Sequence, residues 1–258
     1  MRGRFVKSIF VELGNLYLFL TNLLRYFLKR QEKMRNLVFE NLVKISFQSL
    51  TIILFTGFFV GAILIVQFHL ILVRYDAISI MGGLGTSAIL REIGPLLISF
   101  LISAKIGSFT TAELGTMKIT EQIDAMRCLG VEPMEFLVIP RFLAIIIATC
   151  LLLFFSLLIG VVGSAFISQF FYGVNFLRFI ESIPRFVNYW TFFGCFFKAF
   201  IYGTIIATVC TCYGMQTKEG AQGVGESVTK SATYNGLFIV IANTLTTMML
   251  EQMHSLIS

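Results

Sequence analysis

Long apolar runs separated by short polar segments make up most of this sequence. A helix needs about 20 apolar residues to cross a bilayer, and five runs are long enough to do so. They cover residues 50–73, 93–112, 141–171, 191–213 and 235–253. The third run is long enough to tilt or to extend beyond the bilayer. The pattern therefore predicts an all-α integral membrane protein with about five transmembrane helices.

Residues 5–28 follow a different pattern, that of an amphipathic helix. Leucine and aromatic side chains gather on one helical face, and polar residues repeat every seven positions on another. The uninterrupted apolar run is too short to span, so we predict a helix that lies in the membrane interface. A sixth span is the alternative. The predicted domains are an N-terminal interfacial region, residues 1–48, and a transmembrane domain, residues 49–258.

The composition supports a membrane protein. Hydrophobic residues make up 57% of the chain and charged residues only 13%, whereas a soluble domain carries about a quarter charged residues. The net charge is +6, but the basic residues crowd into the first 48 positions beside apolar segments. This arrangement favours an anionic membrane surface over nucleic acid. We therefore predict no nucleic-acid partner.

The distribution of lysine and arginine predicts the orientation of the spans. Residues 1–48 hold nine of them, and such residues concentrate on the cytoplasmic side. A cytoplasmic N-terminus also makes segments 113–141 and 214–234 cytoplasmic, for fourteen basic residues in all. The outer loops, 74–92 and 172–190, then hold four. Five spans place the C-terminus on the outer side.

The cysteines and histidines indicate neither catalysis nor a metal site. The five cysteines include no CxxC pair and mostly lie within apolar runs, where a thiol usually acts as a small buried hydrophobe. His69 and His254 lie far apart, near the ends of apolar segments. No Ser–His or Cys–His set can be assembled. We predict no catalytic residue, no metal and no cofactor.

The polar stretch ELGTMKITEQIDAMRCLGVEP, Glu113–Pro133, interrupts the apolar pattern. Thr120 can cap the N-terminus of a helix. Gly130 can take the left-handed position at its end, and Pro133 prevents its continuation. The sequence therefore predicts a short cytoplasmic helix over 120–129.

This short helix has two possible roles, a solvated surface or a docking element for a cytoplasmic partner. A helix of this length is unstable alone and needs a surface to pack against. Two neighbouring carboxylates are too few ligands for a metal ion. The candidate docking residues are Glu121, Gln122, Asp124, Met126 and Arg127.

Several stretches together carry a resemblance to a known family. The motifs are LREIGPLL, AELGTMKITEQIDAM, LGVEPMEFLVIPRFLA and, near the C-terminus, TKEGAQGVGESVT. They resemble the MlaE (YrbE) family, the permease subunits of ABC systems that move phospholipids between bacterial membranes. The resemblance covers approximately residues 40–250. Two positions depart from it, because Lys105 replaces a usual arginine and Asn243 a usual aspartate.

The resemblance implies a function, a location and several partners. Two copies form the core of the transporter in the bacterial inner membrane, with the N-terminus cytoplasmic and the C-terminus periplasmic. A separate ABC ATPase binds the short polar helix, which becomes a coupling helix. An MCE-domain protein lies on the outer side, and a STAS-domain protein often binds the ATPase. The competing hypotheses are a secondary transporter or channel, and a membrane anchor without a transport path.

The chain has no recognisable ATP site of its own. The nearest candidate is GVGESVTKS, Gly223–Ser231. A Walker A loop needs a glycine directly before the Lys-Ser pair and another five residues earlier. Thr229 and Val224 occupy those places. We therefore expect a partner to supply the energy.

Charged residues in or near two spans form a second candidate site. Arg91 and Glu92 are predicted to begin the second span on the outer side, and Lys198 to lie inside the fourth. Intramembrane charges usually face a cavity or a partner. Two hypotheses stay open: the three residues brace the helix ends, or they form a polar rim for a phospholipid headgroup.

The GxxxG pair Gly57 and Gly61 permits close helix packing, within one chain or across a dimer.

Overall fold

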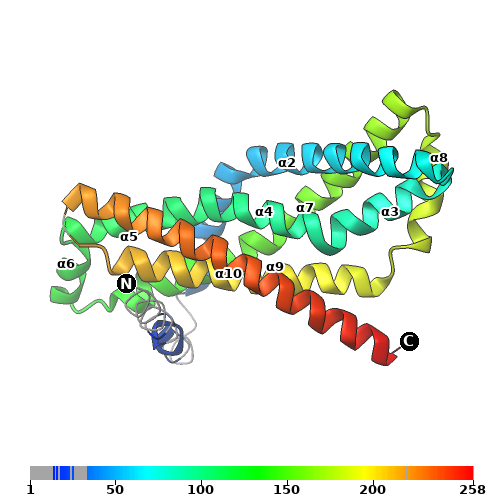
Figure 1. The fold of residues 1–258 in the computed structure, drawn as a ribbon. Coiled ribbons are helices and arrows are strands. Elements are labelled where there is room, and N and C mark those ends of the chain that lie inside the picture. Colours follow the sequence, from blue (N-terminus) through cyan, green and yellow to red (C-terminus); the bar gives the residue numbers. More distant parts are fainter. Residues whose placement is uncertain are drawn as a thin grey trace, which may run out of the picture. The chain divides into compact units, whose positions relative to one another are not determined.

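The computed structural model describes residues 14, 16, 18–23, 25, 34–218 and 220–257. These residues are mostly helical and include no strand. Figure 1 labels the helices along the chain. The α-helices are α2 (Met34–Arg74), α3 (Met81–Ala88), α4 (Gly94–Ile102), α5 (Ser108–Ile119), α6 (Gln122–Cys128), α7 (Ile139–Tyr172), α8 (Phe176–Ser182), α9 (Tyr189–Met215) and α10 (Gly220–Ile257). The π-helical segments are η2 (Ile89–Ile93), η3 (Ser103–Gly107) and η4 (Met134–Val138), and the 3-10 helices are η1 (Ile78–Ile80) and η5 (Ile183–Arg185).

The prediction of an all-α protein with five transmembrane helices is confirmed. Five helical runs in the described part of the chain are long and apolar enough to cross a membrane. A bilayer offers no water to the backbone, so a spanning segment satisfies its N–H and C=O groups within its own helix. The runs are Met34–Arg74, Ile78–Ile119, Met134–Tyr172, Tyr189–Met215 and Gly220–Met253.

The predicted interfacial helix over 5–28 lies mostly outside the described residues. Those of its residues that are described, from position 14 to position 25, are helical. Leu16 and Leu23 are buried while Leu18 and Asn22 are exposed. The described residues therefore have one buried and one exposed side.

The internal contacts divide the described residues into two compact units. Unit 1 takes them from 1–45, 103–147 and 204–236. Unit 2 takes them from three other ranges, which are 46–102, 148–203 and 237–258. The predicted headgroup residues belong to unit 2, and the polar stretch belongs to unit 1.

Within unit 2, the GxxxG pair packs α2 against α7 of the same chain. A Cβ atom added at Gly61 would collide with the backbone of Gly160, and one added at Gly57 would collide with Ser156. The Ser156 hydroxyl also donates a hydrogen bond of 2.9 Å to the Ile53 carbonyl. Close backbone approach is what small residues permit in membrane helices. The pair therefore contributes to packing within the chain.

Gly61→Ala is expected to destabilise the protein by about 1–3 kcal/mol, the usual cost of overpacking a tight contact. The collision is with backbone, which cannot rotate away as a side chain can. Thermal unfolding in detergent measures the effect. Gly225→Ala on α10 is the matched control, because an added Cβ there meets no atom within 4 Å. Equal melting temperatures for both variants would contradict the packing assignment.

The segment predicted as an outer loop, residues 74–92, is mostly helical, and this part of the prediction is wrong. The second span begins at Ile78. Gly82 and Gly83 lower helix propensity and hydropathy here, which hid the helix in the sequence pattern. Both pack closely against α8, and the Gly83 N–H donates a hydrogen bond of 2.8 Å to the Ser182 hydroxyl. Tertiary contacts with α8 thus outweigh weak local propensity.

Arg91 and Glu92 consequently lie inside the second span and not at its beginning. They belong to η2, directly before Gly94 and Pro95. Pro95 therefore lies within the continuous helical run of the second span. Proline removes one helical hydrogen bond, and the wider π turn before it is a common way to accommodate that loss.

Candidate functional site

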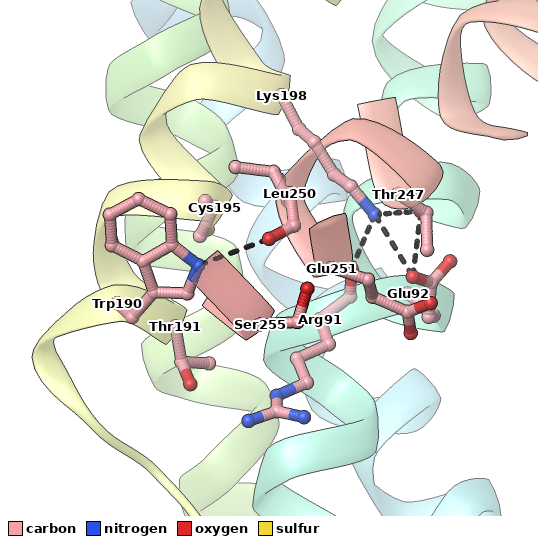
Figure 2. A pocket seen from close by; sticks show the side chains of 11 residues that line it. Arg91, Glu92, Trp190, Thr191, Cys195, Lys198, Thr247, Leu250, Glu251 and Ser255 are labelled. Atoms are coloured by element: carbon pink, nitrogen blue, oxygen red, sulfur yellow. Dashed lines mark hydrogen bonds and ion pairs between the residues drawn. The ribbon is translucent and has the colours of Figure 1, made fainter. Parts of the chain in front are cut away.

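A cavity of about 340 Å³ in unit 2 collects the charged residues predicted for the outer side (Figure 2). Its walls come from η2, α9 and α10. This volume is at the small end of ligand pockets, enough for a polar headgroup but not for a whole lipid. The lining residues are Arg91, Glu92, Trp190, Thr191, Gly194, Cys195, Lys198, Thr247, Leu250, Glu251 and Ser255.

The Lys198 ammonium is the centre of the polar contacts in this cavity. Its side chain is 2% exposed and forms an ion pair of 3.2 Å with Glu92, whose side chain is 41% exposed. It also donates hydrogen bonds to the Thr247 hydroxyl at 2.7 Å and to Asn243 Oδ1 at 3.3 Å. A buried charge is tolerated when paired and hydrogen-bonded in this way. Lys198 thus joins α9 to α10 and to the π turn.

A fourth contact of Lys198 is with the backbone of the second span, close to Pro95. Its ammonium donates a hydrogen bond of 2.6 Å to the backbone carbonyl of Arg91. In an α-helix this carbonyl would accept from the N–H of residue 95, and Pro95 has no N–H. Lys198 therefore supplies a donor to a backbone carbonyl in the π turn before the proline.

Arg91 extends away from this cluster (Figure 2). Its side chain is exposed and lines the cavity. Among the described residues its guanidinium has no hydrogen bond or ion pair, so it is available to an incoming anion. A guanidinium matches the geometry of a phosphate with two parallel N–H donors.

Three residues of the cluster were missed by the sequence analysis. Thr247 donates a hydrogen bond of 2.7 Å to Glu92 Oε1. Asn243 donates one of 3.3 Å to Glu92 Oε2 and accepts one of 2.7 Å from the Tyr202 hydroxyl. Asn243 and Thr247 are four residues apart on α10, so they share one helical face. That spacing was the available signal, but it did not reveal their partner.

In unit 1, the polar stretch forms α6, a shorter helix than predicted. It spans Gln122–Cys128, and the predicted N-cap at Thr120 is wrong. Thr120 ends α5, and its hydroxyl donates to the carbonyl of Thr116. Glu121 takes a left-handed conformation with φ of 60° and makes the turn between the two helices.

The end of α6 is as predicted. Gly130 is left-handed with φ of 74°. The Val131 N–H donates to the Met126 carbonyl at 2.9 Å and the Gly130 N–H to the Arg127 carbonyl at 3.0 Å. These two bonds form a Schellman motif, a common helix terminator.

A buried isoleucine holds α6 against the rest of unit 1. Ile123 is fully buried and packs with Leu114 and Leu137, beside Met117 and Met215. A helix of seven residues depends on such contacts. This anchor keeps α6 at the end of α5 (Figure 1).

The Asp124 carboxylate is partly exposed to solvent and also forms ion pairs with side chains of unit 1. It pairs with Lys118 at 2.9 Å and with Arg127 at 3.3 Å. The hydrogen bond from Lys118, with the charges of Lys118 and Arg127, holds the pKa of the Asp124 carboxyl below its ordinary value. Its contribution to stability is therefore present at neutral pH and is lost only as acid lowers the pH through that depressed value.

Apolar side chains are exposed beside the charged face of α6. Leu129 is 80% exposed, and Phe136 and Val131 are also exposed. They line a groove of about 560 Å³ together with Met126. Leu129 and Val131 lie between the second and third apolar spans, outside both. Such apolar exposure away from lipid is typical of a protein-binding surface.

The other predicted docking residues share this end of unit 1. Glu121, Gln122 and Arg127 are exposed, while Met126 is half-buried in the groove wall. The residues that sequence reasoning missed are Leu129 and Phe136, which look like ordinary apolar positions when only hydropathy is considered. Within the described residues, no group of three or more His, Cys, Asp or Glu side chains could hold a metal ion.

The segment that resembles a phosphate-binding loop is not a loop. Gly223–Ser231 is helical over its whole length as part of α10. A P-loop binds phosphate with the N–H groups of an open, glycine-rich turn, and in a helix interior these groups are already bonded.

Comparison with known proteins gives consistent matches over most of the chain. A family model described as Permease MlaE matches residues 38–249. A probable ABC transporter permease of Synechocystis sp. is 35% identical over 79% of this chain and 78% of that protein. One of Rickettsia typhi is 30% identical over 83% of each. The chloroplastic protein TRIGALACTOSYLDIACYLGLYCEROL 1 of Arabidopsis thaliana is 33% identical over 76% of this chain and 56% of that protein.

Proposed function

This chain belongs to the MlaE permease family, and from that premise we propose that it moves phospholipids between the inner and outer membranes of a bacterium. In this role it is the membrane-spanning subunit of an ABC transporter and contributes to lipid asymmetry. A separate ATPase supplies the energy. The observation that carries the proposal is a cavity among apolar helices whose Arg91 guanidinium has no partner among the described residues.

The chemistry of the cavity supports a phospholipid as the cargo. Arg91 offers hydrogen-bond donors to a phosphate. Lys198 and Glu92 also line the cavity, but their charges compensate each other in an ion pair. The four contacts of Lys198 support the bracing role for that residue, which leaves Arg91 as the direct headgroup contact. The name of the Arabidopsis relative contains a galactolipid, and this supports a lipid cargo in a more general way.

The surface around α6 supports an ATPase partner. It combines the exposed charges of α6 with the exposed Leu129 directly after the helix, and Ile123 holds α6 against the rest of unit 1. The same unit contains an ion cluster in which Glu113 pairs with Lys44 of α2 at 2.8 Å and Arg141 of α7 at 3.5 Å. A force applied to α6 therefore reaches α5, and through Glu113 the neighbouring helices.

The remaining partners and the orientation follow from the family resemblance. The transporter contains a second copy of this chain, an MCE-domain protein on the outer side and a STAS-domain protein at the ATPase. The N-terminus is cytoplasmic and the C-terminus periplasmic, as the excess of Lys and Arg in residues 1–48 favours.

Arg91→Gln is expected to lower phospholipid transfer about tenfold. A hydrogen bond to an ionised group contributes about 1.5–3 kcal/mol, and about 1.4 kcal/mol corresponds to a factor of ten. The assay measures fluorescent phospholipid transfer from vesicles that contain the complex purified with its ATPase. Arg185→Gln, on η5 and outside the cavity, is the matched control. Wild-type transfer by the Arg91 variant would exclude the cavity as the headgroup site.

A further inference from the structure

The charges that line the cavity do not all compensate one another. Four charged side chains line it: Arg91, Glu92, Lys198 and Glu251. Lys198 forms an ion pair of 3.2 Å with Glu92, and its other hydrogen-bond acceptors are neutral oxygen atoms. Within the described part of the chain, neither Arg91 nor Glu251 forms an ion pair. The cavity thus offers one unpaired cation and one unpaired carboxylate.

Glu251 is placed on the side of α10 that carries the cluster. It follows Thr247 by four residues, so the two side chains share a helical face. Thr247 already contacts both Lys198 and Glu92, and Figure 2 shows Glu251 among the side chains of the cavity. Lys198 is one cation beside two carboxylates. Glu251 forms an ion pair with neither Lys198 nor Arg91 in the described structure, so its carboxylate can accept an incoming cation.

An aromatic ring lines the same cavity. The Trp190 indole donates a hydrogen bond of 3.3 Å to the Leu250 carbonyl, which immediately precedes Glu251 in the chain. Its ring also stacks with Phe193, with centroids 5.4 Å apart. These contacts fix the ring in place. Tryptophan attracts cations more strongly than other aromatic side chains, so the ring is a second feature of the cavity that suits a cationic group.

We propose that the cavity selects zwitterionic phospholipid headgroups, with Arg91 on the phosphate and Glu251 on the ammonium. This inference rests on the proposed function and adds the class of headgroup to it. A phosphate that carries ethanolamine compensates both unpaired side chains at once. A phosphate that carries glycerol brings no cation and leaves Glu251 uncompensated near an anion.

The test is a competition between two lipids with the same acyl chains. The complex purified with its ATPase is reconstituted in vesicles of equimolar dioleoyl phosphatidylethanolamine and dioleoyl phosphatidylglycerol. Lipids that copurify after extraction are quantified by mass spectrometry. Wild-type protein is expected to retain several-fold more of the ethanolamine lipid. Glu251→Gln is expected to bring the ratio close to one, whereas the control Glu181→Gln, on α8 outside the cavity, keeps the wild-type ratio.

Two further variants separate selectivity from folding and from the proposed function. Glu251→Asp keeps the charge and is expected to keep most of the preference, while Arg91→Gln is expected to reduce retention of both lipids alike. If wild type retains both lipids equally and Arg91→Gln loses both, the zwitterion inference is wrong and the headgroup cavity stands. If Arg91→Gln changes neither lipid, the cavity is not a headgroup site and both proposals fail. Equal loss of both lipids in Glu251→Gln would assign Glu251 a structural role and overturn the inference.

Discussion

Lys198→Met is expected to destabilise the folded protein by about 3 kcal/mol, the lower end of the range for breaking a buried ion pair. The lower end applies because Glu92 is 41% exposed and water partly screens its charge. The substitution keeps the length and apolar stem of the side chain. It leaves the Glu92 carboxylate without its cation and the Arg91 carbonyl without its donor. The measurement is the thermal unfolding of the full complex in detergent.

Two second-site substitutions test the origin of this loss separately. Glu92→Gln on the Lys198→Met background removes the uncompensated charge and should recover most of the stability. Pro95→Ala restores an N–H four residues after Arg91 and should recover a smaller part. Lys105→Met is the control, because Lys105 is exposed and has no ion pair in the described structure. Full stability of Lys198→Met, with lipid transfer abolished, would instead make Lys198 a headgroup contact.

The spans were predictable from the sequence because hydropathy over 20 residues is a strong signal. Their ends were not, because tertiary contacts extend the helices into less apolar segments. The clearest case is residues 78–88, where Gly82 and Gly83 weaken the helical pattern but allow α8 to approach closely. Likewise, the left-handed Glu121 that separates α5 from α6 has no preference visible in its residue type.

Three of the four charged residues that line the candidate site were predicted from the sequence, and Glu251 was not. An ionisable residue within an apolar run is conspicuous, and Arg91, Glu92 and Lys198 do line one cavity. Their neutral partners on α10 were not predictable, because Asn243 and Thr247 acquire their importance from a helix distant in sequence. The proline effect was also hidden. It requires knowing that Lys198 reaches the Arg91 carbonyl in the π turn before Pro95.

The geometry of α6 changes how its role in coupling is best tested. Asp124 is bound to Lys118 of α5, so Asp124→Lys would remove a contact between α6 and α5 as well as alter the surface of α6. Arg127 is more exposed, and within the described part of the chain its side chain forms an ion pair with its helical neighbour Asp124 alone, at 3.3 Å. Arg127→Glu therefore changes the surface charge with less disturbance of the fold. A substitution at Leu129 disturbs the fold even less, because this side chain is 80% exposed.

Leu129→Glu is expected to weaken binding of the ATPase at least tenfold, because it places a charge where an apolar side chain would be buried by the partner. Desolvating an unpaired carboxylate costs more than the lost apolar contact itself. Combined with Arg127→Glu, it should abolish the complex while the permease still inserts and unfolds at its normal temperature. Copurification of the coexpressed ATPase measures the effect. Leu177→Glu, at a similarly exposed leucine on α8 of unit 2, is the control and should leave copurification unchanged. A double variant that retains the ATPase and transfers lipid normally would show that the surface around α6 is not where the energy of ATP hydrolysis enters the permease.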